Sequence, residues 1–301
     1  MYPISGIFRK KARDALKGHW QTALLIALIV NLPTLLIQGF AVVTGNDPAD
    51  RLPAFITAAS RDGVMSYEAL TAEIRTLITS AGFWAIRGLD LLAWLATPCL
   101  ALGMYKWVLD RLAGQEPQLN TVFSRVRIFF KAAGLQLLIV LKILAWMLPG
   151  IAAAVIALLP AFRAADQQSM ALAVQSSYAM ALPITLLIAI PGAMAALRYA
   201  LAELIMAENP ENKILFCVRR SKYLMEGQKK NLFMLLISFL LWYLLSMLIS
   251  SMVPGVIALV VQMLASLALS VYMSASVGCF YRYLEKSGEQ KEKDSEDTDH
   301  A

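Results

Sequence analysis

Six long apolar runs constrain this chain more than any other feature of its sequence. They cover residues 22–43, 86–108, 133–159, 179–207, 232–253 and 256–281, and each supplies the roughly 20 apolar residues that a helix needs to cross a bilayer. The composition agrees, because 58% of the residues are hydrophobic and 16% are charged, whereas about 25% are charged in soluble domains. The sequence therefore predicts an all-α polytopic membrane helix bundle with six transmembrane helices, folded as a single membrane domain over residues 1–284.

Lys and Arg residues are unevenly distributed between the segments that connect these runs. Twenty lie in the N-terminal segment, the second and fourth connections and the segment after the last run, if Lys106 near the end of the second run is counted with the connection that follows it. The outer connections hold four, which are Arg51, Arg61, Arg75 and Arg163. Because Lys and Arg accumulate on the cytoplasmic side, this count predicts a multi-pass cell-membrane protein with both termini in the cytoplasm.

Three segments next to the runs are basic and amphipathic. Residues 6–17, 123–131 and 212–228 combine an apolar helical face with several Lys or Arg side chains. Such helices typically lie in the membrane interface with their charges near anionic headgroups, so lipid headgroups on the cytoplasmic face are the predicted partners. Outside a C-terminal tail of net charge −4 the chain carries +10. In a membrane protein this favours lipid over nucleic acid, which has no support in the sequence. No motif identifies a protein partner.

The remaining segments are less informative. Residues 285–301 are rich in Glu, Asp, Lys and Ser and have no apolar face, so they predict a disordered acidic cytoplasmic tail. The polar first connection contains a helical pattern over residues 67–79. Cys99, Cys217 and Cys279 fit neither a metal-ligand spacing nor a disulfide framework, so we interpret them as packing residues.

An internal repeat is one interpretation of the basic segments. The stretch from Gly18 to Pro33 aligns without gaps on the stretch from Gly134 to Pro149, and each follows a basic segment. Residues 219–227 resemble a third, looser copy. The chain would then consist of three helical-hairpin repeats, an organisation common in transporter folds. Sequences rich in Leu and Ala also produce such matches by chance, and both interpretations stay open.

A spaced pattern lies near the middle of the chain. It consists of Arg198-Tyr199-Ala200-Leu201, then Ser221, Met225, Gly227 and Lys229, and then Leu236, Ser238, Phe239 and Trp242. Together with residues 9–20 and Phe280-Tyr281, this pattern resembles a bacterial family of multi-span membrane proteins known only as the domain of unknown function nine-seventy-five. The resemblance implies an integral protein of the bacterial inner membrane with no assigned activity, and it names no active-site residues.

Four polar side chains form a candidate intramembrane polar cluster. Asn31, Lys142 and Arg198 lie on the order of 15 Å from the cytoplasmic ends of their runs, at 1.5 Å per helical residue. Glu203 is about 140° around the helix from Arg198, so Lys142 on another run is its better partner. An isolated charge at this depth costs at least about 2.5 kcal/mol. The cluster is either a positive ligand site for an anionic solute or headgroup, or a structural cluster in which the cations bind backbone carbonyls freed by proline.

The catalytic inventory argues against an enzyme. The two histidines are His19, at the membrane surface, and His300, in the tail, and Asp90 is the one aspartate within a run. A Ser-His dyad, a zinc site or a paired-aspartate mechanism cannot be assembled within the bilayer from these residues, and no cofactor or metal motif appears. The sequence therefore favours a non-catalytic accessory protein that organises lipid or a partner complex. The alternative is a transporter or channel for a small anionic solute or lipid.

Overall fold

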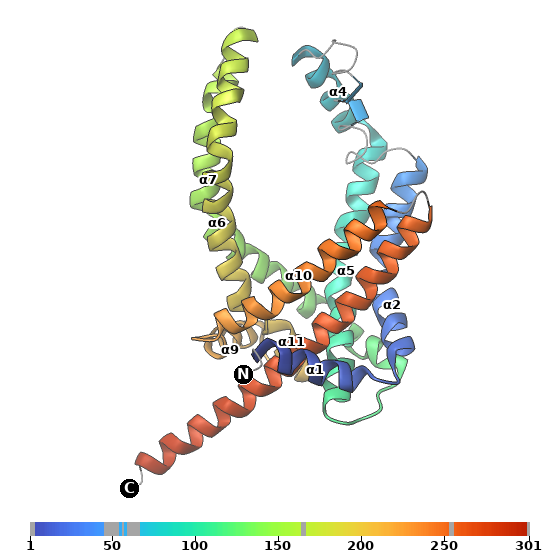
Figure 1. Cartoon of the computed structure of the whole chain (residues 1–301), viewed down its shortest axis with the longest axis vertical. Coiled ribbons are helices and arrows are strands. Elements are labelled where there is room, and N and C mark those ends of the chain that lie inside the picture. The colour runs from blue at the N-terminus through green and yellow to red at the C-terminus, as the bar shows by residue number, and fades with distance from the viewer. Residues whose placement is uncertain are drawn as a thin grey trace.

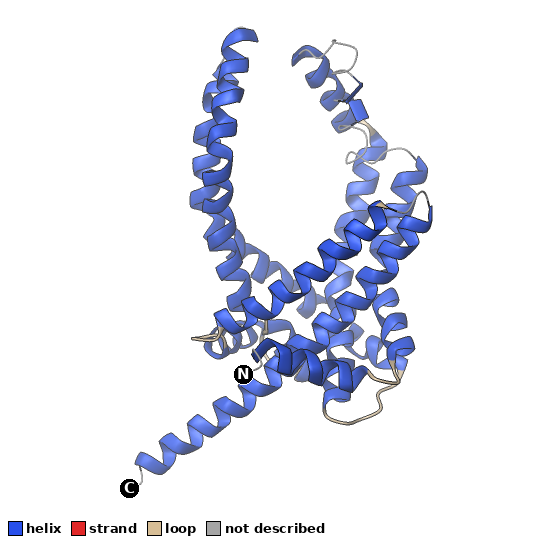
Figure 2. Ribbon diagram, viewed as in Figure 1, coloured by secondary structure: helices blue, strands red, loops and turns tan. Residues whose placement is uncertain are grey.

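The computed structural model describes residues 4–44, 54–55, 57–58, 67–163, 167–252 and 256–299, and within these ranges it contains helices and no strand (Figure 2). Six helices are long and apolar enough to cross a membrane, which confirms the predicted all-α multi-pass membrane protein. The long helices are α2 (Trp20–Thr44), α5 (Ala81–Leu112), α6 (Phe129–Arg163), α7 (Gln167–Tyr199), α10 (Lys229–Ser251) and α11 (Val256–Asp299).

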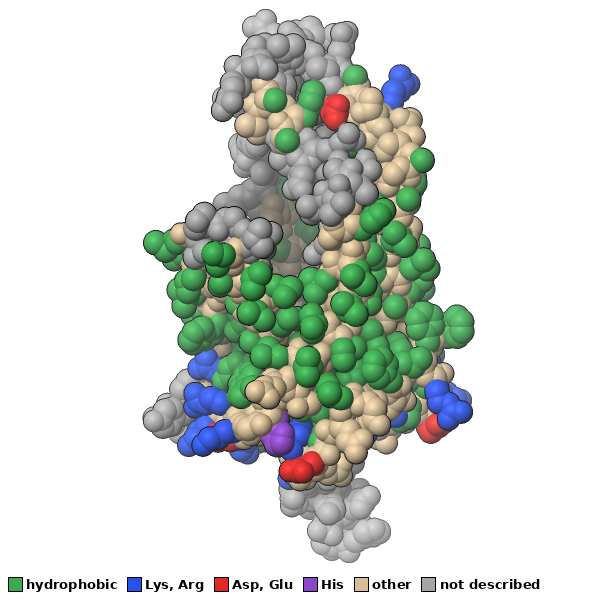
Figure 3. All heavy atoms as spheres, turned by 90° about the vertical axis from the view of Figure 1, so that its right-hand side faces the viewer, with side chains coloured by type: hydrophobic (Ala, Val, Ile, Leu, Met, Phe, Trp, Pro, Cys, Tyr) green, Lys and Arg blue, Asp and Glu red, His purple; other side chains and the backbone are tan. Residues whose placement is uncertain are grey.

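Shorter elements connect the long helices. They are α1 (Ile4–Leu16), α4 (Tyr67–Thr79), the 3-10 helix η1 (Leu119–Ile128), α8 (Ala202–Glu208) and α9 (Ile214–Leu224). The elements α1, η1, α8 and α9 lie at one end of the bundle together with both chain termini (Figure 1). We call this end the basic face, because Lys and Arg side chains gather there below an apolar band over the long helices (Figure 3).

The long helices form two arms that meet at the basic face (Figure 1). Helices α6 and α7 pack along each other as the first arm, and α2, α5 and α11 form the second. Helix α10 begins near the base of the first arm and crosses to the second, where it packs on α11. Gly150 permits the close contact within the first arm, since a Cβ there would lie 2.8 Å from the backbone nitrogen of Ile188. The buried core concentrates where the arms meet, and its largest side chains include Trp107, Phe239 and Phe280.

The predicted fourth span, 179–207, is not one helix. It is divided into α7, which begins earlier than predicted, and the short buried helix α8. Ser221 of α9 bridges the break, because its hydroxyl donates to the carbonyl of Arg198 at 3.1 Å and accepts from the backbone N–H of Leu201 at 3.3 Å. A hydroxyl inserted into the helix ladder lets the chain turn without leaving these backbone groups unpaired.

The C-terminal segment belongs to α11, which continues as a helix to Asp299 and projects from the bundle (Figure 1). The disorder expected from residue 285 onward stays a prediction. Glu, Lys and Gln are good helix formers. A segment that extends an existing helix does not bear the cost of nucleation, so the helical geometry of this tail follows from the membrane helix before it.

The segments α1–α2 and α9–α10 repeat the same local structure. In each, a surface helix ends at a glycine with positive φ, Gly18 at 81° or Gly227 at 74°, before the long helix begins. Their buried positions have equal spacing, with Phe8, Ala12 and Leu16 corresponding to Cys217, Ser221 and Met225. Residues 219–227, the looser copy in the sequence, are therefore the closer match to the first copy in structure. The copy that begins at Gly134 matches less well, because Gly134 lies inside α6 and not in a turn.

Each basic segment packs on the helices that come before it in the chain, except that α1, which comes first, packs on the last hairpin. Helix α1 packs mainly on α11, η1 on α5, and α9 on α8. The chain thus contains three interlocked units, α1–α2–α5, η1–α6–α7–α8 and α9–α10–α11. This arrangement agrees with three helical-hairpin repeats and brings all the short basic elements to one end of the molecule.

Candidate functional site

Glu208, the last residue of α8, is the centre of a polar network at the basic face. Its carboxylate pairs with Arg282 and accepts a hydrogen bond from the hydroxyl of Tyr281 at 2.6 Å. Arg282 also pairs with Glu285 at 3.0 Å. Arg125 of η1 donates to the carbonyls at the end of α8, at 2.6 to 3.3 Å. These bonds satisfy the last carbonyls of α8 and join it to η1 and α11, so the network is structural.

Glu203 of the predicted polar cluster does not pair with Lys142 in this structure. Its side chain interacts with that of Tyr105 on α5, because the chain turns at the end of α7 and α8 packs on α5. Tyr105 was missed at the level of sequence. No pattern around it signals this role, since the partner is set by the break between α7 and α8.

The other three members of the predicted cluster are also separate. Asn31 Nδ2 donates to the carbonyl of Ala27 in its own helix at 2.8 Å. The side chains of Lys142 and Arg198 are half-buried and have no hydrogen-bond or ion-pair partner in the described part of the chain. No hydrogen bond or ion pair between described residues joins any two of the four, and a ligand role for them stays a prediction.

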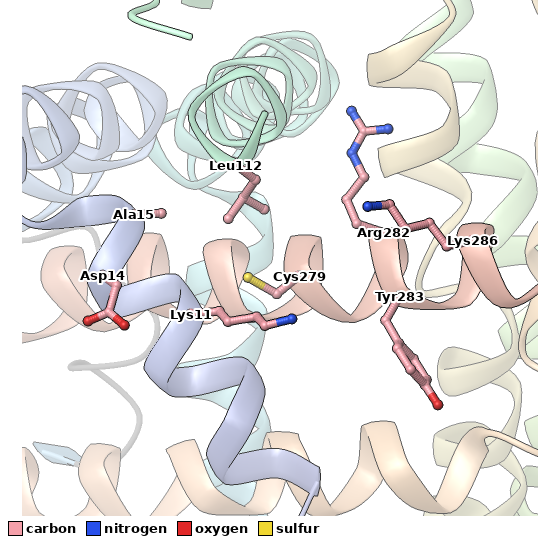
Figure 4. A pocket seen from close by; sticks show the side chains of 8 residues that line it. All are labelled: Lys11, Asp14, Ala15, Leu112, Cys279, Arg282, Tyr283 and Lys286. Atoms are coloured by element: carbon pink, nitrogen blue, oxygen red, sulfur yellow. The ribbon is translucent and has the colours of Figure 1, made fainter. Parts of the chain in front are cut away.

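Two pockets lie beside α1 at the basic face. The first, which we call the Cys279 pocket, is a cavity of about 410 Å³ between α1, α5 and α11. Figure 4 shows its lining residues, which are Lys11, Asp14, Ala15, Leu112, Cys279, Arg282, Tyr283 and Lys286. Its cations Lys11, Arg282 and Lys286 are offset by Asp14 in the lining and by the two carboxylates that hold Arg282. The Cys279 pocket is therefore close to electrically neutral.

The second pocket, which we call the Tyr272 pocket, is a cavity of about 490 Å³ between α1, α2, α10 and α11. It is lined by Gly6, Arg9, Lys10, Arg13, Trp20, Trp242, Leu269 and Tyr272. Its wall is held in place by Tyr272, whose hydroxyl donates to the carbonyl of Arg9 at 3.2 Å and whose ring centroid lies 6.3 Å from that of Trp20.

The charges of the Tyr272 pocket are not compensated. Its lining contains Arg9, Lys10 and Arg13 and no acidic residue. None of these three side chains has an ion-pair or hydrogen-bond partner among the residues that the structure describes, and Arg9 Nε is a buried donor without an acceptor. An unpaired buried donor costs about 1 to 3 kcal/mol. The pocket is therefore suited to a ligand that carries negative oxygen atoms.

The sequence identified part of this site. Residues 6–17 were expected to form a basic amphipathic helix in the membrane interface. Helix α1 has the amphipathic form, but its apolar residues Phe8, Ala12 and Leu16 are buried against the protein, and its place in the interface stays a prediction. The contributions of Trp242 and Tyr272 were missed, because they follow α1 by more than two hundred residues and reach it only through the packing of α1 on α10 and α11.

The cysteines lie in the packed interior. Cys99, Cys217 and Cys279 are buried and free, in agreement with their interpretation as packing residues. Burial raises the pKa of the Cys217 thiol, and nearby Lys131 only partly opposes this shift. Among the described residues, no group of three or more His, Cys, Asp or Glu side chains is placed to hold a metal ion.

Comparison with protein families gives a match over most of the chain. The model of the family described as "Protein of unknown function (DUF975)" matches residues 5–288. The searches of curated proteins and of solved structures find no match to this chain. The matched region contains the apolar stretches of all six long helices, of which α11 extends beyond it, and both pockets beside α1.

Proposed function

Because this chain belongs to the DUF975 family, which is described as having unknown function, we propose a function from its own geometry. The protein is a non-catalytic accessory membrane protein that organises anionic lipid in the inner leaflet of the bacterial cell membrane. The basic face lies at the cytoplasmic side, and both termini are in the cytoplasm. The chemistry of the basic face does not identify a protein partner.

The orientation is supported by where the cations and termini lie. The short elements α1, η1 and α9 carry nine of the 27 Lys and Arg residues of the chain, and both termini lie at the same end of the bundle (Figure 1). Cytoplasmic segments of membrane proteins accumulate Lys and Arg, and the cytoplasmic leaflet carries the anionic lipids that attract them.

The uncompensated cations of α1 are the observation that carries this proposal. Arg9, Lys10 and Arg13 have no carboxylate partner among the described residues, and they line one pocket together with the apolar side chains of Trp242 and Leu269. Each Lys or Arg near an anionic membrane surface contributes about 1 kcal/mol of attraction. Trp20 beside them, the first residue of α2, is typical of the membrane–water boundary.

The proposal is tested by thermal unfolding of the purified protein in micelles that contain phosphatidylglycerol or phosphatidylcholine. A ligand that binds the folded state stabilises it by mass action, so we expect the unfolding midpoint to rise with the fraction of phosphatidylglycerol. The rise should shrink at high ionic strength, because salt screens exposed charges. Equal midpoints in the two lipids at low salt would contradict an anionic-lipid function.

Transport of a small anionic solute or lipid is the second candidate. It is favoured by Lys142 and Arg198, two half-buried cations of the first arm that lack a described partner. Neither pocket beside α1 includes them. Uptake of organic anions into protein-containing vesicles, measured for wild type and Lys142→Met, separates the two functions: flux that Lys142→Met abolishes supports transport, whereas no flux above protein-free vesicles argues against it.

A further inference from the structure

We propose that the Tyr272 pocket binds the phosphate group of one anionic phospholipid molecule. In this complex the cations of α1 contact the phosphate oxygens, and the aromatic and apolar wall contacts the glycerol and the first acyl carbons. The inference rests on the proposed function and deepens it, because it replaces a diffuse attraction to the membrane surface by a defined site.

The polar groups of the pocket wall are hydrogen-bond donors, so they fit a ligand with several acceptor atoms. Arg9 and Arg13 are four residues apart on α1, so they project from the same helical face. The guanidinium group is a planar fork of donors that matches phosphate oxygens. Arg9 Nε is buried without an acceptor, and the indole N–H groups of Trp20 and Trp242 have no partner in the described part of the chain. A phosphodiester supplies negative oxygens and brings no competing donor.

The apolar part of the wall indicates that the phosphate belongs to a lipid. Trp242 on α10 and Leu269 on α11 line the pocket together with the cations, so one cavity has a charged side and an apolar side. Trp242 is exposed, and so are Leu241 and Leu245 beside it on α10. An acyl chain attached to a phosphate in the pocket could therefore leave along α10 into the bilayer, whereas a soluble phosphate would gain nothing from this wall.

The site is held rigid by contacts on the other face of α1. The Phe8 ring packs edge-on against Phe280 with centroids 5.5 Å apart, and the Tyr272 hydroxyl binds the carbonyl of Arg9. Tyr272 in turn packs against Phe239, with centroids 5.1 Å apart. Since these bonds fix α1 before any ligand arrives, binding does not have to order the helix.

The Cys279 pocket provides a matched control on the opposite side of α1. It also contains three cations, but Arg282 is occupied by Glu208 and Glu285, and Asp14 lies in its lining (Figure 4). Replacing Lys11 and Lys286 there removes the same charge as replacing Arg9 and Arg13. A diffuse electrostatic attraction responds equally to both changes, whereas a defined site responds to one.

The experiment measures equilibrium binding of a short-chain fluorescent phosphatidylglycerol to the full-length protein in neutral micelles. The double variant Arg9→Gln/Arg13→Gln should weaken binding about 30-fold or more, because it removes the charge-assisted hydrogen bonds of two guanidinium groups to the phosphate. The control Lys11→Gln/Lys286→Gln should change binding by less than about threefold. Trp242→Ala should also weaken it, and because Trp242 is exposed this variant decides the question if the double variant does not fold.

Other outcomes would overturn the site. An equal loss of binding in both double variants would show a diffuse attraction. Equal binding of phosphatidylcholine and phosphatidylglycerol would show that binding does not depend on the negative charge of the lipid. Competition by soluble glycerol phosphate at the same concentration as the lipid would show a site for a free phosphate. If wild type prefers phosphatidylglycerol but the Arg9/Arg13 variant binds it with unchanged affinity, the Tyr272 pocket is not the lipid site, and the proposed function is retained. If wild type shows no preference, the proposed function fails as well.

Discussion

At the scale of single residues, two ion pairs of this protein differ because their surroundings differ. The side chain of Glu208 is 20% exposed and is bound by Arg282 and Tyr281. Arg87 and Asp90 lie one turn apart near the beginning of α5, where the second apolar run starts and the membrane interface is expected, and they are 42% and 39% exposed. Exposed pairs contribute about 0 to 1 kcal/mol, whereas breaking a more buried, hydrogen-bonded network costs more. The Glu208 network should therefore contribute more to stability.

Glu208→Gln is expected to lower the free energy of unfolding by about 1 to 2 kcal/mol, because it removes the charge that holds Arg282 while keeping the shape of the side chain. Asp90→Asn is the matched control and should change it by less than about 0.5 kcal/mol. Denaturant unfolding in detergent micelles measures both values. A larger loss for Asp90→Asn would refute this ranking of the two pairs.

At the scale of elements, η1 is docked on α5 by a close backbone approach. A Cβ added at Gly103 would lie 1.9 Å from the carbonyl oxygen of Val122, which is fully buried. Trp107 also fixes this region, since its indole N–H donates to the carbonyl of Pro117 at 3.1 Å. The packing of η1, the second basic segment, on α5 therefore requires a glycine at position 103.

Gly103→Ala is expected to lower the free energy of unfolding by about 1 to 3 kcal/mol or more, because the neighbouring atoms belong to backbone that cannot rotate away. Gly88→Ala on the same helix meets nothing within 4 Å and is the control; it should be neutral or slightly stabilising. Thermal unfolding in micelles compares them. Similar midpoints for the two variants would mean that η1 is not packed on Gly103 as described.

At the scale of the whole molecule, the short helices of the three units interlock at the basic face, and α11 of the third unit also packs on α2 and α5 of the first. Helices α1, η1 and α9 each cover a neighbouring unit there, and both termini lie at the same end (Figure 1). An even number of spans returns the chain to the side on which it began. The orientation of the whole bundle then follows from the Lys and Arg count.

A reporter enzyme that is active only outside the cytoplasm tests this orientation. Fused after Glu285, it should be silent, because the basic face is expected in the cytoplasm. Fused after Thr79, at the end of α4, it should be active. Activity at Glu285 together with silence at Thr79 would invert the proposed topology and remove the basic face from the anionic leaflet.

The sequence by itself determined the six apolar helices, the basic amphipathic segments and the helix at 67–79. These features depend on local properties, because the length of an apolar run and its helical period are contained within one stretch of chain. The glycine turns at Gly18 and Gly227 are local in the same sense, since the residue type permits the positive φ. Such features follow from residues that are neighbours in the sequence.

Only the tertiary structure decided which side chains meet. Glu203 faces Tyr105 rather than Lys142 because Ser221 of another helix bridges the break before α8. The Tyr272 pocket joins α1 to residues more than two hundred positions away. Helices with apolar surfaces all round pack in many similar ways, and their sequences do not encode which neighbour each side chain will touch. The contacts were selected by the joint packing of all three units, and this is why the site could not be found in the sequence alone.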